Sequence, residues 1–308
     1  MKSDFWWMFI FLVIIMIQLL IMIYWKQAKF WTMINILFLF LAIFYYSSYS
    51  FKKIVNQELE LMSARSKVKK NSLIQQQLTV LPNIVQKWLI NSGAMAKEPI
   101  YEVCIDQELQ MLMDPEQEKW VPAQASQYFT TTPPAFNWFV HLKLNPWLKV
   151  VGRDKFDNGQ GSMVMKLYSL FPVVNLNNND KLNQASLQRY LAEIVWFPSA
   201  ALKPYIKWES IDDYSARAIM EYQGVKGSGV FYFDENGDFK KFKALRYKDI
   251  NDLQATEWTV IATKTALLNG LRIPVESQVK WKLIDGDWTW LKVKITAITY
   301  NIQNSPIR

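Results

Sequence analysis

Two long apolar runs near the start of the chain limit its fold more than any other feature. Phe5–Trp25 reads FWWMFIFLVIIMIQLLIMIYW, in which Gln18 is the only strongly polar residue, and Phe30–Tyr46 reads FWTMINILFLFLAIFYY. At about 1.5 Å per residue, a helix of roughly twenty residues crosses the ~30 Å hydrocarbon core of a bilayer. Only Lys26–Lys29 separates the two runs. The sequence therefore predicts a transmembrane helical hairpin over residues 1–49, with the lipid bilayer as its first partner.

Aromatic side chains gather at the ends of both runs, as they do at membrane–water interfaces. A cleaved signal peptide is the alternative, but the first run is too long for its apolar segment and no small-residue cleavage site follows. The turn carries Lys26 and Lys29, and the cations outside the hairpin are Lys2, Lys52, Lys53, Arg65, Lys67, Lys69 and Lys70. Because cytoplasmic segments carry the excess of Lys and Arg, we expect a two-pass protein with both termini and the following domain in the cytoplasm.

Composition excludes several classes of protein. Hydrophobic residues make up 51% of the chain and aromatic residues 15%, which excludes a disordered chain. The single cysteine, Cys104, excludes an intramolecular disulfide, and the single histidine, His141, excludes a histidine metal cluster. The net charge of +8 is not concentrated in one arm or stripe, so we expect no nucleic-acid partner. No phosphate-binding loop or nucleophile elbow is present, and we assign no cofactor, metal site or catalytic residue.

The rest of the chain changes from a helical pattern to an alternating one. Residues 50–80 are rich in Lys, Gln, Glu, Leu and Ser and predict a juxtamembrane helix or linker. Beyond Leu81-Pro82, apolar and polar residues alternate with the period of a strand, as in Phe136–Asn145, Tyr214–Tyr222 and Leu291–Ala297. Turn signals such as Asp157-Asn158-Gly159 separate these runs, which favours antiparallel pairing.

Helical spacing interrupts the strands at Ile84–Leu89 and from Ser186 to about Val195. One face of each strand is apolar, so one face of the sheet has to be covered. We therefore predict an α+β fold for residues 81–308, in which a large curved antiparallel β-sheet forms a half-open, barrel-like cup with helices packed against its concave side.

Short motifs spread over Leu81 to Asn301 resemble a known family. They are Leu81-Pro82 with Val85, Trp88 and Leu89, Phe136-Asn137-Trp138, Gly152-Arg153-Asp154 with Gly159 and Gly161, Arg189-Tyr190-Leu191-Ala192-Glu193 with Trp196 and Pro198, Gly270, Arg272-Ile273-Pro274, Trp281 and Tyr300-Asn301. The pattern is similar to that of bacterial, often membrane-anchored domains of unknown function, although Glu108–Met113 lacks a glycine and an arginine expected there. The resemblance implies a bacterial plasma membrane location and a sheet-and-helix cup similar to lipoprotein carriers, with no established activity.

Several polar residues are candidates for ligand binding. Arg189 and Glu193 share a helix face at spacing i, i+4 and flank Tyr190, so they form either a clamp for a ligand head group or a structural ion pair. Arg153 and Asp154 follow a short apolar run at a predicted strand end. With the turn after them they form either an ion-binding loop or a turn held by local hydrogen bonds.

Four tryptophans complete the candidate site: Trp138, Trp196, Trp208 and Trp281. We predict that their rings converge on one concave apolar surface around a cavity of roughly 300 Å³ or more. The alternative is that the rings fill separate parts of a packed core.

Three function classes follow from these residues. The first is a membrane-anchored binding module that holds a lipid or other apolar ligand near the bilayer. The second is a membrane-tethered interaction domain that docks a membrane-protein partner, and it takes precedence if the four rings lie apart. An enzyme is the weakest of the three, because no reactive pair with an activating neighbour can be named.

Overall fold

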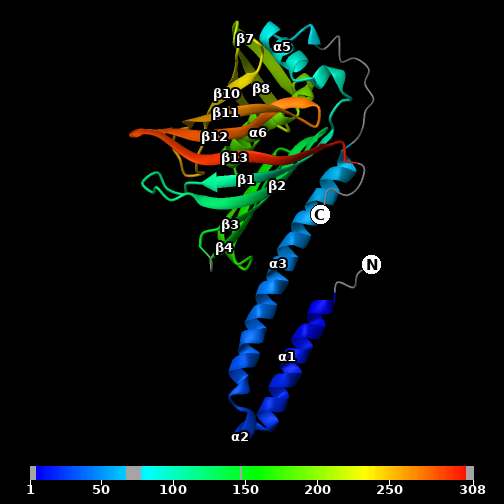
Figure 1. Ribbon diagram of the computed structural model, residues 1–308, viewed down its shortest axis with the longest axis vertical. Coiled ribbons are helices and arrows are strands. Elements are labelled where there is room, and N and C mark those ends of the chain that lie inside the picture. Colours follow the sequence, from blue (N-terminus) through cyan, green and yellow to red (C-terminus); the bar gives the residue numbers. More distant parts are fainter. Residues whose placement is uncertain (1–4, 67–77, 146–147, 303–308) are drawn as a thin grey trace.

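The computed structural model describes residues 5–66, 78–145 and 148–302. Figure 1 shows a pair of long helices that projects from a strongly curved sheet, with the short helix α5 at the far end of the domain. The helices of the hairpin are α1 (Trp6–Ile23), α2 (Trp25–Ala28) and α3 (Trp31–Arg65). The predicted fold class, two long apolar helices followed by an antiparallel half-barrel with packed helices, is confirmed.

Within the described residues, thirteen antiparallel strands form a single sheet. In chain order they are β1 (Glu102–Met111), β2 (Val121–Thr131), β3 (Pro134–Lys143), β4 (Lys149–Asp157), β5 (Gln160–Leu167), β6 (Phe171–Asn177), β7 (Ile206–Asp212), β8 (Ser215–Tyr222), β9 (Val225–Phe233), β10 (Phe239–Arg246), β11 (Thr256–Leu268), β12 (Leu271–Leu283) and β13 (Gly286–Tyr300). Their order in the sheet is β6-β5-β4-β3-β2-β1-β13-β12-β11-β10-β9-β8-β7. The chain therefore starts at the centre, runs outward to one edge, crosses to the other edge and returns beside β1.

Two-residue turns set the register of several hairpins. Asn158-Gly159, Gln223-Gly224 and Asn269-Gly270 all have positive φ at both residues. This conformation is the type I′ turn, whose twist matches that of two antiparallel strands. The first of these turns is the one that the sequence predicts. Most strands also follow the predicted alternation, since β1 changes between buried and exposed residues along most of its length.

The single crossover between the two wings of the sheet contains helix α6 (Asp180–Glu193). The side chain of Asn179 accepts a hydrogen bond from the Lys181 backbone N–H at 3.0 Å and so caps its first turn. The helix begins six residues before the predicted start at Ser186, because Leu182 and Ala185 are the only apolar residues in its first six positions. Short 3₁₀ helices continue it at Ile194–Trp196 and Pro198–Leu202.

Helix α6 lies in the concave face and contacts both wings of the sheet, β4 and β5 on one side and β8, β9 and β10 on the other. A glycine in each wing permits this approach. A Cβ atom on Gly161 of β5 would lie 2.6 Å from the Ser186 Oγ, and one on Gly227 of β9 would lie 2.7 Å from the Gln188 Cγ. The curved sheet therefore closes around a helix, and most of the concave space is filled.

The tips of the two wings also touch. A Cβ atom on Gly159, in the turn between β4 and β5, would lie 2.7 Å from the Cβ of Gln223, in the turn between β8 and β9. At the other end of the concave face, helix α5 (Asn83–Asn91) covers β8 and β9 through Trp88, whose ring lies 6.0 Å from that of Phe231. A further 3₁₀ turn, Ala94–Ala96, follows α5.

The opposite, convex face carries the C-terminal half of α3. Phe51 packs on Phe139 of β3, with ring centroids 5.9 Å apart, and Met62 is buried against Tyr128 of β2. The Glu58 carboxylate lies 2.8 Å from the Lys155 Nζ of β4. This packing is absent from the sequence-based prediction. One helix continues across residue 49, the predicted boundary of the hairpin, and residues 67–77 of the predicted linker lie outside the described residues.

Candidate functional site

A buried ion triad links α6 to the concave face of the sheet. The Arg189 guanidinium lies 2.6 Å from the Asp154 carboxylate of β4 and 2.9 Å from the Glu193 carboxylate one helical turn further on. Its Cζ lies 4.8 Å above the ring of Trp138 on β3. Burial acts to lower the pKa of Arg189, but the two carboxylates outweigh it and raise that pKa above its ordinary value. The guanidinium therefore stays charged between two acids and an aromatic face.

Neutral side chains extend this triad across β2 and β1. The Gln127 Nε2 donates to the Glu193 Oε2 at 2.9 Å, and the Gln107 Nε2 donates to the Gln127 Oε1 at 3.1 Å. The Trp138 Nε1 donates to the Gln107 Oε1 at 2.9 Å and completes the chain of bonds. The Asp154 Oδ1 alone keeps no hydrogen-bond partner among the described residues. Because five interactions join its six side chains, this network holds the helix on the sheet.

A second guanidinium, that of Arg246 at the end of β10, lies near this triad. Its Nε donates to the Ala185 carbonyl of α6 at 3.0 Å, and its Cζ lies 4.8 Å from the Trp258 ring centroid. Burial lowers the pKa of Arg246 to about 10 despite the nearby Asp154 carboxylate, so the group stays protonated at neutral pH. No carboxylate in the described part of the chain lies within 4.0 Å of it. Arg246 is therefore a half-buried cation without an ion-pair partner among the described residues.

Sequence reasoning missed Arg246 because the cations from Lys240 to Lys248 fit contact with an anionic membrane surface and an edge or solvated hairpin equally well. The structure corrects the edge interpretation, because β10 lies between β9 and β11 inside the sheet. The alternation of apolar and charged residues along β10 is the signal that could have identified Arg246. Phe242 and Ala244 are buried and share a strand face with Arg246, whereas Lys241 and Lys243 lie on the other face.

The four predicted tryptophans occupy four different surroundings. Trp138 lies under Arg189, Trp208 lies beside Trp88 and Phe231, and Trp281 faces Trp258 with ring centroids 6.3 Å apart. The Trp196 Nε1 donates to the Pro274 carbonyl at 3.1 Å, and its ring lies beside Phe129. All four belong to or pack against the same large apolar core, but each has different ring neighbours.

The other predicted site residues are also divided. Arg153 and Asp154 lie in the middle of β4 and not at a strand end, and they point to opposite faces. The Arg153 Nε lies 3.4 Å from the Glu58 carboxylate of α3, on the convex side, while Asp154 joins the triad inside. Tyr190 is fully buried and donates from its hydroxyl to the Thr130 carbonyl at 3.0 Å. Asp154, Arg189, Glu193 and Trp138 are therefore the predicted residues that the structure brings together.

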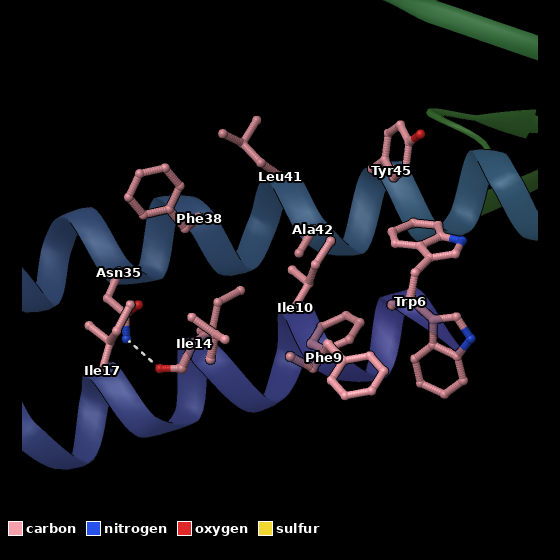
Figure 2. A pocket seen from close by; sticks show the side chains of 13 residues that line it. Trp6, Phe9, Ile10, Ile14, Ile17, Asn35, Phe38, Leu41, Ala42 and Tyr45 are labelled. Carbon is pink, nitrogen blue, oxygen red and sulfur yellow. Dashed lines mark hydrogen bonds between the residues drawn. The ribbon is translucent and has the colours of Figure 1, made fainter. Parts of the chain in front are cut away.

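One cavity lies in the helical hairpin. It is a groove of about 490 Å³ between α1 and α3. Apolar side chains such as Ile10, Phe38 and Leu41 line it (Figure 2). Asn35 also lines the groove, and its Nδ2 donates to the Ile14 carbonyl at 3.0 Å and to the Gln18 Oε1 at 3.0 Å. The Asn35 Oδ1 is buried and has no partner among the described residues.

The second cavity, of about 330 Å³, lies where α6 begins and is lined by polar residues that include Lys181, Gln184 and Tyr247. Neither cavity is lined by Trp138, Trp196, Trp208 or Trp281. Among the described residues, no group of three or more His, Cys, Asp or Glu side chains could hold a metal ion.

Solved structures of related shape but low sequence identity include the following three. A DUF1329 family protein from Desulfovibrio piger is 10% identical at a TM-score of 0.42, over 72% of this chain and 95% of that one. A LolA superfamily protein from Nitrosomonas europaea is 9% identical at a TM-score of 0.35, over 72% and 93%. A β-barrel-like protein of the domain of unknown function DUF1849 from Brucella abortus is 11% identical at a TM-score of 0.29, over 67% and 100%.

No curated protein matches the sequence. A family profile does, and it covers residues 79–300, the extent over which the short motifs described above are spread. The predicted resemblance to a family without an established activity is thereby confirmed. The chain belongs to the family of unknown function DUF6920.

Proposed function

We propose that this chain is a membrane-anchored binding module whose sheet domain holds a lipid or other apolar ligand close to the bilayer. The separation of the four predicted tryptophans favours the interaction domain, so the binding module has to rest on a different observation. The observation that carries the proposal is the continuity of α3. Its first half belongs to the apolar hairpin, and its second half packs on the sheet through Phe51, Val55 and Met62, each at most 4% exposed. Anchor and domain therefore move as one body, which keeps the concave face within reach of the bilayer.

The exposure of the hairpin supports insertion. Helices α1 and α3 are both long and apolar enough to cross a membrane, and only 11% of each apolar stretch is buried. A core helix of a soluble protein would bury most of such a stretch. Cations outside the hairpin outnumber those of its turn, which supports a domain on the cytoplasmic side of a bacterial plasma membrane.

Contacts between the domain and α3 support a position at the bilayer surface. The ring of Tyr168, in the turn between β5 and β6, lies 5.4 Å from that of Phe44, and the Ser47 Oγ donates to the Ser169 carbonyl at 3.0 Å. Phe44 belongs to the predicted span, so this turn reaches the level where the span ends. The next strand begins with Phe171 and Val173, which are 55% and 60% exposed. Apolar side chains at that level gain stability by burial in the membrane interface.

A fluorescence experiment tests the anchor and the position of the domain together. Single cysteines at Phe38, Phe171 and Leu267, in a Cys104→Ser background, are labelled with bimane, and the full chain is reconstituted into phosphatidylcholine vesicles that contain doxyl-labelled lipid. Strong quenching is expected at position 38 inside the span and at position 171. Little quenching is expected at position 267, which is 72% exposed. It lies two residues before Asn269, whose carbonyl accepts a hydrogen bond from Lys97 at the end of the domain that carries α5.

The three labels separate the possible failures. Quenching at position 38 without quenching at position 171 would keep the anchor and contradict the position of the domain on the bilayer. An absence of quenching at position 38 would contradict the anchor itself.

The groove in the hairpin supports a second candidate function, an interaction module whose partner is a second copy of this chain. The Asn35 Oδ1 is an unpaired acceptor, and Gln18 has a spare amide hydrogen, since its Nε2 donates only to the Thr32 hydroxyl among the described residues, at 3.4 Å. An acyl chain cannot pair with either group. Two copies related by a two-fold axis can pair each spare donor with the other copy's acceptor, which removes both unpaired groups from the hydrocarbon.

We expect the full chain to form dimers in nonionic detergent, measured by native mass spectrometry at micromolar concentration. Asn35→Leu should shift the population to monomers, because it removes the acceptor. Leu37→Ala, at a lipid-exposed position outside the groove lining, is the matched control and should leave the dimer unchanged. A wild-type chain that is monomeric at tens of micromolar would contradict this candidate.

A further inference from the structure

Three tryptophans stand side by side across neighbouring strands on the concave face. Trp258 of β11 is directly opposite Trp281 of β12, and Trp281 is directly opposite Trp288 of β13. Directly opposite residues of antiparallel strands share one face of the sheet. Trp258 and Trp281 are each 4% exposed, whereas Trp288 and its neighbour Trp290 are half-buried. These residues form a tryptophan platform, Trp258–Trp281–Trp288, that extends from the packed interior to a partly open margin.

Cations without carboxylate partners accompany this platform. The Arg246 Cζ lies 4.8 Å from the Trp258 ring centroid and 5.7 Å from that of Trp281. The Lys248 Nζ lies 6.0 Å from the Trp288 ring centroid. Asp154 and Glu193 are the acids nearest to Arg246, and both are bound to Arg189. The platform therefore has one charge sign available for a ligand, and it is positive.

Unpaired donors mark the same place. The indole Nε1 atoms of Trp258, Trp288 and Trp290 are buried and have no hydrogen-bond partner among the described residues. Buried N–H groups are nearly always paired in native proteins, because an unpaired one loses its bond to water without replacement. Trp258 lies on β11 and the other two lie on β13, on either side of β12, and these unpaired donors indicate that a molecule with acceptor oxygens binds along this part of the sheet.

We propose that the tryptophan platform and Arg246 form the binding site for an amphiphile with an anionic head group, a carboxylate or a phosphate. The proposal rests on the proposed binding function and names its ligand class. Head-group oxygens accept hydrogen bonds from the Arg246 guanidinium and from indole N–H groups, the strongest kind of pairing for an anion. The apolar part of the ligand lies along the half-buried rings of Trp288 and Trp290, where each methylene removed from water adds to affinity.

The site discriminates by charge. A cationic head group would meet Arg246 and Lys248, while the two neighbouring carboxylates already form ion pairs with Arg189 and only the Asp154 Oδ1 is left without a partner. A neutral head group would pair with the indole donors but leave the guanidinium without a counter-charge. We therefore expect anionic amphiphiles to bind most tightly, neutral ones of equal chain length less tightly, and cationic ones least.

Native mass spectrometry of the full chain in nonionic detergent tests this order with dodecyl phosphate, dodecanol and dodecyltrimethylammonium as probes. Dodecyl phosphate should saturate at one molecule per chain. Arg246→Gln should weaken the affinity for dodecyl phosphate by roughly tenfold, because a charge-assisted hydrogen bond is lost. Arg217→Gln is the matched control, since that arginine is exposed on β8 with its side chain 52% accessible, and it should bind like the wild type.

A second variant covers the case in which Arg246→Gln does not fold. Trp288→Phe keeps an aromatic ring at the partly open margin but removes the indole donor, and it should weaken dodecyl phosphate several-fold. The proposal would be overturned if a folded variant, either Arg246→Gln or Trp288→Phe, bound dodecyl phosphate as tightly as the wild type does. If dodecanol or the cationic probe binds as well as the phosphate, the anionic site fails while the binding module stands. If none of the three probes binds, both the anionic site and the binding module are contradicted.

Discussion

Tyr190→Ala is expected to lower the free energy of unfolding by about 3 kcal/mol or more, the usual cost of removing a large buried ring. Tyr190 is fully buried in α6 and contacts the rings of Phe129, Phe197 and Tyr205. Its hydroxyl also donates to the Thr130 carbonyl at 3.0 Å, which joins the helix to β2. The substitution therefore removes a ring and a cross-link at the centre of the cup.

Urea unfolding of the full chain in detergent, followed by tryptophan fluorescence, measures this loss. Tyr190→Phe is the control, because it keeps the ring and removes only the hydroxyl bond, at a cost of about 1 kcal/mol. An alanine variant as stable as the wild type would show that α6 does not hold the two wings of the sheet together.

Arg189→Ala is expected to destabilise the fold by about 3–5 kcal/mol, because it leaves the Asp154 and Glu193 carboxylates buried without their cation. The Asp154 and Glu193 side chains are only 4% and 13% accessible, so water would replace little of the stabilisation that Arg189 gives their charges. Thermal unfolding of the full chain followed by circular dichroism measures the loss. Arg217→Ala breaks an exposed pair with Glu209, whose side chains are 52% and 55% accessible, and should cost about 0–1 kcal/mol.

The same variant separates the two interpretations of Arg189 that the sequence leaves open. A structural triad predicts a lower melting temperature. A head-group clamp predicts normal melting and loss of dodecyl phosphate binding. The hydrogen bonds from Gln127 and Gln107 behind Glu193 favour the structural triad, because they hold the acid in place without any ligand.

Local patterns in the sequence are sufficient to predict much of this fold. Apolar length identifies α1 and the first half of α3, and alternation with Asn-Gly or Asp-Gly signals identifies most strands. These features depend on neighbours within about ten residues along the chain. The family resemblance adds the cup shape. The start of α6 is missed because its first turn is mostly polar and only Asn179, a capping residue, marks it.

The contacts that build the candidate site cannot be predicted in the same way. Trp258, Trp281 and Trp288 become neighbours only through the register of β11, β12 and β13, and single-residue bulges in those strands shift that register. Arg246 faces inward because β10 is an interior strand, which depends on the order of the whole sheet. The packing of α3 on the convex face likewise depends on charges far apart in sequence, such as Glu58 and Lys155.

The order of the strands has a consequence for how the protein is made. β1 lies beside the central strand of the finished sheet, β13, and β13 is the last strand to be synthesised. Until residues 286–300 leave the ribosome, one edge of β1 keeps its backbone N–H and C=O groups unpaired. Open strand edges pair with other chains and lead to aggregation. A nascent chain that stops before Gly286 would therefore expose the middle of its sheet, and we expect it to need a chaperone or to be degraded.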